Sequence, residues 1–336
     1  MTTEEIFKKI LDILSRNPDG VPQPYIHRSL GLSKAYISIL LRNMEKQGIV
    51  YRVKVGNTYV VKLTKRVTPT HNNLRLGIVW SSEYLFLGHF AKLLRDSLNI
   101  NLTVSVYPSA IQATSAIIRG EVNGVLSPLM TQLYAYILTR GIVIVGGGAG
   151  GGAMVFEFPK SGSDVIISSE ASSMDLCRFI ATRKGIVEYG NVRYFGTPNE
   201  ALEIIKRGRA RYAVIWHPLT TFTKLVTHRV VAECGDFEEM KHCCTLALSR
   251  TMDTETVEKV SEIYRVAIDA FLKQPLRYVE WYSSITGIDT ALLKEALRIY
   301  RYAADIEIRS VKKVLETLNL DIPQKDTVLN NVLLFP

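Results

Sequence analysis

The sequence has little that would place the chain in a membrane or mark it as a familiar type of enzyme. Its 336 residues contain no apolar run near the ~20 residues that span a bilayer. They contain no H-E-x-x-H, no G-x-S-x-G and no acidic metal pair, and no Gly-Lys-Ser/Thr is present. We therefore expect no membrane partner, no cofactor, no bound metal and no enzymatic activity.

Cysteine is scarce as well. The four cysteines are Cys177, Cys234, Cys243 and Cys244. Two stand alone and two are adjacent, so none has the spacing of a zinc finger or of a disulfide framework. The adjacent pair follows His242 in an apolar, strand-like run. The expectation is that these are buried structural thiols rather than a reactive site.

The start of the chain lacks the features of an export signal. The stretch MTTEEIFKKILDILSR is amphipathic and has neither a continuous apolar segment nor a cleavage site. Apolar residues make up 47% of the sequence and charged residues 22%, which is the composition of a folded protein. We expect a cytoplasmic protein of two or three domains.

Positive charge is concentrated in the first fifth of the chain. The net charge is +9, and residues 1–66 hold 12 Lys and Arg against 5 Asp and Glu, a net of +7. The remainder holds 29 basic and 27 acidic residues, a net of +2. Such asymmetry indicates a polyanion-binding module joined to a nearly neutral body.

Residues 1–66 show the pattern of three helices followed by a β-hairpin. An amphipathic helix comes first, and a short second helix ends at Gly31. Ser33 is a favourable N-cap for the third helix. The apolar residues of that helix recur at helical spacing and predict a buried stripe of Ile37, Leu40, Leu41 and Met44. Two β-rich runs then flank Gly56-Asn57, a two-residue hairpin signal.

This order resembles the MarR-like winged helix-turn-helix domains of bacterial and archaeal regulators. The likeness rests on L-G-L-S-K-A-Y-I-S-I-L-L-R-N-M-E-K-Q-G-I-V followed by the hairpin. It implies that residues 33–47 enter the major groove of duplex DNA with the hairpin beside them. The expected DNA-binding residues are Ser33, Lys34, Tyr36, Ser38, Arg42, Arg52, Lys54 and Lys62. The alternatives are a winged helix used for protein contacts or an ordinary solvated basic face.

The segment after the hairpin changes character twice. Thr64–Asn73 is polar and predicts a linker, which we place at residues 67–73. From Leu74 onward, strand-like and helical stretches alternate in two blocks, which predicts parallel sheets with helices on both faces. The stretch from Thr254 to Leu318 is mostly helical in pattern.

A glycine-rich segment separates the two blocks. Ile142–Phe158 reads IVIVGGGAGGGAMVFEF, with an apolar run on each side of six glycines. Gly146–Gly151 fits G-x-G-x-x-G, but the residues after it have no helical period, so a dinucleotide site is not favoured. We predict a flexible crossover between two lobes, and the alternative is a plain glycine loop.

The two blocks share a strand–helix–strand phrase that ends at a proline. It reads Y-P-S-A-I-Q-A-T-S-A-I-I-R-G-E-V-N-G-V-L-S-P in the first block and V-R-Y-F-G-T-P-N-E-A-L-E-I-I-K-R-G-R-A-R-Y-A-V-I-W-H-P in the second. Together they resemble the type II periplasmic-binding-protein fold, most of all the binding proteins for sulfonates, taurine and thiamine-pyrimidine precursors. The resemblance implies a two-lobed α/β domain whose lobes are joined near residues 142–158 and 228–246. The implied parts are a first lobe over 74–145, a second over 146–240, and a return to the first over 241–336.

A ligand of such a domain is expected beyond the carboxyl ends of the strands, where helix N-termini offer free amides. That rule selects Ser81, Ser82, Ser109, Ser127, Gly147, Gly148, Ser172, Ser173, Trp216 and His217. Hydroxyls and amides without a dense group of cations suit a small polar or anionic molecule. Each serine is also explained as a helix cap, and His217 is equally compatible with packing.

The sequence as a whole predicts a one-component transcription regulator. Its winged helix would bind double-stranded DNA, and its cleft would bind a small-molecule effector. A homodimer or higher oligomer is expected, because one winged helix reads only a short half-site. The alternatives are a cytoplasmic enzyme on the binding-protein fold that acts on a pyrimidine or sulfonate, and a non-catalytic ligand carrier.

Overall fold

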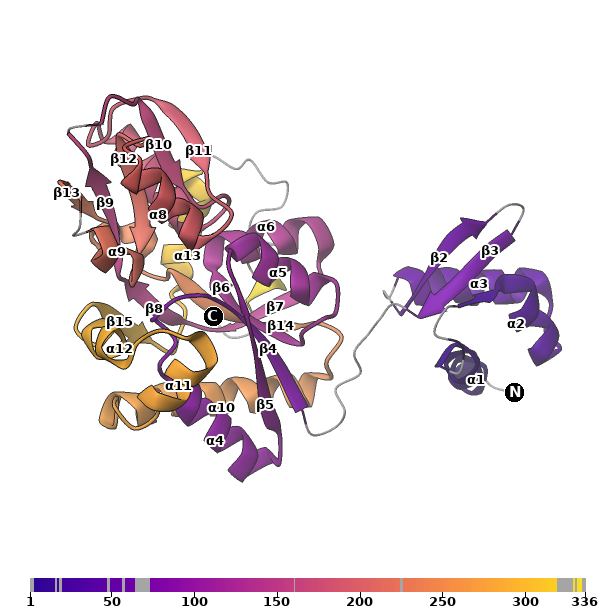
Figure 1. The fold of residues 1–336 in the computed structure, drawn as a ribbon. Helices are drawn as coiled ribbons and strands as arrows, with labels where there is room; N and C mark the ends of the chain where they lie inside the picture. The colour runs from indigo at the N-terminus through magenta and orange to yellow at the C-terminus, as the bar shows by residue number, and fades with distance from the viewer. Residues whose placement is uncertain are drawn as a thin grey trace. The chain divides into compact units, whose positions relative to one another are not determined.

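The chain forms two compact units, Met1–Val67 and Thr68–Pro336 (Figure 1). The computed structural model describes residues 3–15, 17, 20–46, 49–55, 58–63, 73–159, 161–223, 226–318, 329 and 331–333. The predicted linker lies outside the described residues except for Asn73, which begins a strand. The predicted turn at Gly56-Asn57 also lies outside them. Within the described part of the chain, no helix has the length and apolar character needed to cross a membrane.

The smaller unit combines three helices with a three-stranded antiparallel sheet. Its elements are α1 (Thr3–Ser15), β1 (Val21–Pro22), α2 (Gln23–Leu30), α3 (Lys34–Lys46), β2 (Val50–Val55) and β3 (Thr58–Leu63). The sheet order is β1-β3-β2. The predicted stripe of α3 is confirmed, with all four of its residues buried in the core of this unit. Ser33 is confirmed as the N-cap, since its Oγ accepts a hydrogen bond from the Tyr36 amide at 3.2 Å.

The larger unit begins with a lobe built on a five-stranded sheet. Its strands are β4 (Asn73–Val79), β5 (Asn101–Tyr107), β6 (Gly124–Pro128), β7 (Ile142–Gly146) and β14 (Cys244–Ser249), in the order β5-β4-β6-β14-β7. The helices packed on it are α4 (Leu87–Leu98), α5 (Ala110–Ile118), α6 (Leu129–Thr139) and α10 (Thr254–Lys273). Strands β4, β5 and β6 are parallel, whereas β14 is antiparallel to both of its neighbours.

The second lobe has a sheet of its own (Figure 1). Its strands are β9 (Ala153–Glu157), β10 (Val165–Ser168), β11 (Asn191–Tyr194), β12 (Tyr212–Trp216) and β13 (Arg229–Glu233), in the order β11-β10-β12-β9-β13. Its helices are α7 (Ser173–Arg183), α8 (Pro198–Lys206) and α9 (Leu219–Phe222). Strand β9 is antiparallel to both neighbours. The prediction of parallel sheets is therefore wrong for the strands next to the crossings, because the chain enters there from the opposite end of the sheet.

The chain passes from the first sheet to the second between β7 and β9, and it returns between β13 and β14. The first crossing contains β8 (Gly148–Gly151), and the second contains two short 3₁₀ helices, η2 (Cys234–Asp236) and η3 (Glu238–Met240). The remaining elements are α11 (Val279–Thr286), α12 (Thr290–Ala296), β15 (Tyr300–Ala303) and α13 (Ile308–Thr317). Strand β15 pairs with β8, so Gly148, Gly150 and Gly151 belong to a small sheet.

Glycines of the first crossing pack closely against neighbouring parts of the chain. A Cβ atom at Gly148 would lie 2.4 Å from the carbonyl oxygen of Cys244, and one at Gly150 would lie 2.4 Å from that of Lys241. These distances are shorter than any real Cβ contact, so only glycine fits. The structure thus has the predicted crossover, and the two crossings touch along their backbones. That the lobes move about this crossover stays a prediction.

The spacing of the cysteines gave no indication of a disulfide, but the structure contains one. Cys177 in α7 and Cys234 in η2 form a disulfide that joins positions 57 residues apart. Cys243 and Cys244 are free and buried. The sequence spacing did not reveal the bonded pair, because α7 and the second crossing become neighbours only once the second lobe has folded.

The disulfide is expected to contribute to the stability of the second lobe. Replacing both residues, Cys177→Ser with Cys234→Ser, should lower the free energy of unfolding by about 2–4 kcal/mol, because the unfolded chain regains the freedom of the closed loop. Denaturant unfolding followed by circular dichroism measures the change. Wild-type protein with the disulfide selectively reduced should match the double variant. Equal stability of the oxidised wild type and the variant would contradict the expectation.

Candidate functional site

A small cavity lies between the two lobes, at the carboxyl ends of their strands. The first lobe contributes Val79, Glu83, Ala110 and Pro128, the second Ser169, Ser172, Met174 and Trp216, and the crossings and the returning chain Gly151, Cys243, Cys244 and Tyr300. The space open to water is about 30 Å³. One water needs roughly 10–15 Å³ on this measure. The cavity therefore has room for two or three waters, and an organic ligand would enter only if the lobes moved apart.

Hydrogen bonds across the cleft hold the lobes in this closed arrangement. Trp216 Nε1, at the end of β12, donates to the Trp80 carbonyl oxygen, just after β4, at 3.0 Å. Ser82 Oγ lies 2.6 Å from Nδ1 of His217, and both side chains are fully buried. The structure thus brings three of the predicted ligand residues together, but their polar atoms serve contacts between the lobes.

Two of the predicted serines cap helices, and a third binds backbone of the returning chain. Ser109 Oγ accepts a hydrogen bond from a backbone amide at 3.3 Å and caps α5, and Ser172 Oγ accepts one at 3.1 Å and caps α7. Ser173 Oγ donates to the carbonyl oxygen of Cys243 at 2.9 Å. Of these three serines, only Ser172 lines the cavity.

Ser127 and Ser81 lie outside the cavity lining. Ser127 is fully buried at the end of β6, where its Oγ accepts hydrogen bonds from Thr114 Oγ1 at 2.9 Å and from Gln132 Nε2 at 3.2 Å. Ser81 Oγ accepts a long hydrogen bond, 3.4 Å, from the Glu83 amide. The strand-end rule located the cleft, but it did not distinguish serines that face it from serines used in the core.

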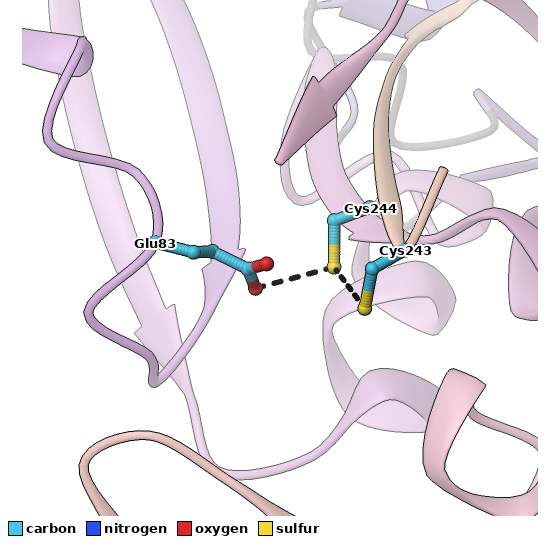
Figure 2. Close-up of side chains that lie close together, drawn as sticks. All are labelled: Glu83, Cys243 and Cys244. Carbon is cyan, nitrogen blue, oxygen red and sulfur yellow. Dashed lines mark hydrogen bonds between the residues drawn. The ribbon is translucent and has the colours of Figure 1, made fainter. Parts of the chain in front are cut away.

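The strand-end rule did not select three side chains that face one another at the cleft. Glu83 follows β4, Cys244 begins β14, and Cys243 precedes it (Figure 2). Cys244 Sγ lies 3.2 Å from Glu83 Oε1 and 3.9 Å from Cys243 Sγ. All three residues are buried and line the cavity. One signal was available for Glu83, which directly follows the two serines selected at the end of β4.

Burial controls the protonation of this group. It raises the pKa of Glu83 to about 7, against the hydrogen bonds from Cys244, Tyr84 and Ser81, which act in the opposite direction. Burial also raises the pKa of the Cys244 thiol well above its ordinary value. A catalytic thiol needs a lowered pKa to supply the thiolate at neutral pH. The arrangement is therefore unsuited to nucleophilic catalysis by Cys244.

A larger groove, of about 590 Å³, lies beside β8 and β15. Two of its charged lining residues are neutralised by ion pairs within the chain, Glu238 by Lys313 and Lys241 by Glu307. It also lies away from the carboxyl ends of the main parallel strands, where ligands bind in open α/β sheets. The cleft between the lobes is therefore the better candidate for a ligand site, despite its smaller volume.

The residues predicted to contact DNA lie on α3 and the hairpin of the smaller unit. Three of the cations are exposed, namely Lys34, Arg42 and Lys54. Arg52 instead forms an ion pair with Glu45, with 2.6 Å between Nη2 and Oε2, and its side chain is only 13% exposed. The hydrogen bond from Arg52 lowers the pKa of Glu45. Tyr36, Ser38 and Lys62 are half-buried, and Ser33 is occupied as the cap of α3.

Comparison of the sequence with known families gives one partial match. A family described as "Domain of unknown function (DUF7343)" matches residues 4–64. No curated protein is significantly similar to this chain in sequence.

Comparison of the structure gives the fold of the larger part of the chain. A ligand-binding component of an ABC-type import system from Staphylococcus aureus, solved with zinc bound, has a TM-score of 0.62 and 14% identity over 78% of this chain and 99% of its own. The alkanesulfonate-binding protein SsuA from Xanthomonas axonopodis pv. citri, bound to MOPS, has a TM-score of 0.62 and 16% identity over 77% and 94%. The periplasmic nitrate-binding protein NrtA from Synechocystis PCC 6803 has a TM-score of 0.62 and 9% identity over 79% and 87%. The two-lobed α/β structure is thus a periplasmic-binding-protein-like fold.

Gly148, predicted to lie beside a ligand, has a structural role that can be tested directly. Gly148→Ala should destabilise the protein by about 1–3 kcal/mol, because the new methyl group forces the Cys244 carbonyl aside. Gly162→Ala is the matched control, since no atom lies within 4 Å of its added Cβ. Thermal unfolding of both variants measures the difference. Equal stability of the two variants would show that the crossings separate easily.

Proposed function

We propose that this chain is a ligand-responsive transcription regulator. Residues 1–66 would bind duplex DNA as a MarR-like winged helix, and the larger unit would bind a small polar or anionic effector between its lobes. The observation that carries the proposal is the concentration of net charge, +7 of +9, in the first 66 residues. Enzymatic activity is not part of the proposal, because burial raises the pKa of the Cys244 thiol, whereas a nucleophilic thiol needs a lowered pKa.

The smaller unit has the element order that a winged helix requires. Helices α1, α2 and α3 are followed by the β2–β3 hairpin, and the short strand β1 completes the sheet. Lys34 and Arg42 are exposed on α3, and Lys54 is exposed on β2. Cations placed this way suit phosphate contacts on both sides of a helix that lies in the major groove.

The effector is proposed from the fold and from the cleft. Proteins of similar structure are named for binding alkanesulfonate and nitrate, which are small anions. The strand ends and the start of α7 meet at the cleft of this chain, and helix N-termini favour negative charge. Because the cavity is now only about 30 Å³, effector binding would require the lobes to open first.

Location and assembly are part of the same proposal. DNA binding requires a cytoplasmic protein, and a dimer would supply two reading helices for two half-sites. The Cys177–Cys234 disulfide limits the kinds of organism in which this protein could act in the cytoplasm. Disulfides are common inside cells chiefly in hyperthermophilic archaea and bacteria.

Binding of the full chain to duplex DNA is the first test. The affinity should fall steeply with salt, by about 0.9 log units per log unit of salt for each phosphate contact. Lys54→Ala should reduce that slope by about 0.9, whereas Arg42→Ala should also change sequence preference if Arg42 contacts a base. Fluorescence anisotropy with labelled duplexes over a salt series gives both quantities.

Lys206→Ala is the matched control, because Lys206 is an exposed lysine of α8 in the larger unit. It should leave both the affinity and the salt slope unchanged. Absence of duplex binding by the full chain at low salt would overturn the regulator proposal. An equal effect of the Lys54 and Lys206 variants would show that binding follows overall charge rather than the hairpin.

Coupling between effector and DNA is the second test. Alkanesulfonates and nitrate serve as probes, and an anion that raises the melting temperature is carried forward. That anion should change DNA affinity by roughly 5–150-fold, and DNA should change the affinity for the anion by the same factor. Titrations in both directions measure the two factors. Identical DNA affinity with and without saturating anion would mean that the two units act independently.

A further inference from the structure

Three potential metal ligands meet at the cleft, from segments far apart in the sequence. Glu83 Oε1, Cys243 Sγ and Cys244 Sγ all lie within 4.8 Å of one another (Figure 2). Their residues are 4%, 6% and 2% exposed. The expectation of no metal rested on the spacing of the cysteines along the chain. Glu83 supplies the third ligand from 160 positions away, and only the fold brings it near.

The convergence of the two sulfur atoms depends on where β14 begins. Within a regular strand, neighbouring side chains point to opposite faces. Cys243 lies just before the strand, and its backbone is held by three hydrogen bonds: its amide donates to the Ala149 carbonyl at 3.2 Å, and its carbonyl accepts from the Leu129 amide and Ser173 Oγ, each at 2.9 Å. This fixed, irregular backbone turns Cys243 Sγ toward Cys244 Sγ.

The electrostatic surroundings of Glu83 favour a cation. The carboxyl group is buried, and none of the groups acting on it within the described residues is a basic side chain. Its neighbours are a thiol, a phenol and a serine hydroxyl. Burying a carboxylate without a counter-charge is costly, and a coordinated metal ion is one of the few ways to offset it.

We propose that Glu83, Cys243 and Cys244 form a binding site for a thiophilic metal ion of the Zn²⁺ class. Two sulfur ligands select soft and borderline ions, whereas Mg²⁺ and Ca²⁺ require oxygen ligands. The site goes beyond the proposed regulator function, and its occupancy does not depend on DNA binding.

Two of the three separations between ligand atoms already approach those of a tetrahedral site. With bond lengths of about 2.3 Å to sulfur and 2.1 Å to oxygen, tetrahedral angles place two sulfurs about 3.8 Å apart and a sulfur about 3.6 Å from an oxygen. The corresponding separations are 3.9 Å and 3.2 Å. The sulfur pair is thus in place, and the carboxylate would move back by a few tenths of an ångström once the metal replaces its hydrogen bond from Cys244.

The fourth coordination position would face the cavity. Three protein ligands leave one position for water or for a donor atom of another molecule, as in metal sites that stay open. The cavity has about 30 Å³ open to water, and one water needs roughly 10–15 Å³. An ion with one bound water therefore fits the closed arrangement of the lobes, without the opening that an organic effector needs.

The test uses the full chain with its disulfide intact, stripped of metal by a chelator, with the two free thiols kept reduced. Zn²⁺ is titrated against a chromophoric competitor, and Co²⁺ serves as a spectroscopic probe. We expect one Zn²⁺ per chain and a Co²⁺ spectrum with thiolate charge-transfer and tetrahedral bands. X-ray absorption of the Zn²⁺ form should show two sulfur ligands at about 2.3 Å and lighter ligands at about 2.0–2.2 Å.

Variants then assign the ligands. Cys243→Ser, Cys244→Ser and Glu83→Gln should each weaken Zn²⁺ binding strongly. The loss should exceed the roughly 10–100-fold that follows when a residue that only hydrogen-bonds a metal ligand is replaced. Ser169→Ala is the control, because Ser169 lines the same cavity without offering sulfur or carboxylate, and it should keep wild-type affinity. Circular dichroism of the metal-free variants confirms that they are folded. If a variant does not fold, the absorption spectrum of the wild type decides the ligand set.

Several results would overturn the proposal. One is wild-type protein that binds neither Zn²⁺ nor Co²⁺ at micromolar concentration. Another is binding that is equal in the wild type and the three ligand variants, or a coordination shell without two sulfurs. A third is a disulfide between Cys243 and Cys244 that persists under conditions that leave other thiols reduced, since an S–S bond of about 2.05 Å removes both ligands. A chain that binds Zn²⁺ at this site but binds no duplex DNA would leave the metal site standing and remove the regulator function.

Discussion

The close approach of two backbones where the chain crosses between the lobes is the constraint on which the larger unit depends. Gly148 lies against the carbonyl of Cys244 and Gly150 against that of Lys241, at distances that exclude a methyl group. Because the two crossings touch, β14 begins beside the cavity, and its first cysteine faces Glu83. The glycines therefore act on the chemistry of the cleft indirectly. They set the position of a backbone that carries two thiols.

The cleft is held closed by hydrogen bonds between the lobes, yet an organic ligand can enter it only if the lobes open. The bonds from Trp216 to Trp80 and between Ser82 and His217 favour a closed form, and each neutral hydrogen bond contributes about 0.5–1.5 kcal/mol. An organic anion would have to overcome those bonds to enter, whereas a metal ion fits the space that remains. A ligand can shift such an equilibrium only by its differential affinity for the two forms. The two kinds of ligand would therefore bias the lobes in opposite directions, the ion toward closure and the anion toward an initial opening.

In the smaller unit, not every basic side chain is available to bind a polyanion. Arg52 is held by Glu45 through a short ion pair and stacks over Tyr59, with 5.2 Å from the guanidinium carbon to the ring centroid. These contacts fix the hairpin to α3 and use the charge within the chain. Lys34, Arg42 and Lys54 remain exposed. A structural role for one arginine beside exposed lysines explains how the unit can be both strongly basic and well packed.

The sequence by itself determined the local elements and the order in which they occur. Helical spacing identified the buried stripe of α3, a single serine identified its cap, and strand–helix alternation indicated α/β structure in two blocks, because each of these signals lies within a few residues. The two-lobed arrangement came from the resemblance to periplasmic binding proteins. The sequence also located the cleft, since ligands of such folds meet the carboxyl ends of strands. Only the tertiary structure decided the rest. Antiparallel β9 and β14, the bond from Cys177 to Cys234 and the meeting of Glu83 with Cys243 and Cys244 all depend on segments distant in the chain. No local spacing encodes such meetings, because the distance between two side chains is set by how the lobes pack and not by the residues that separate them.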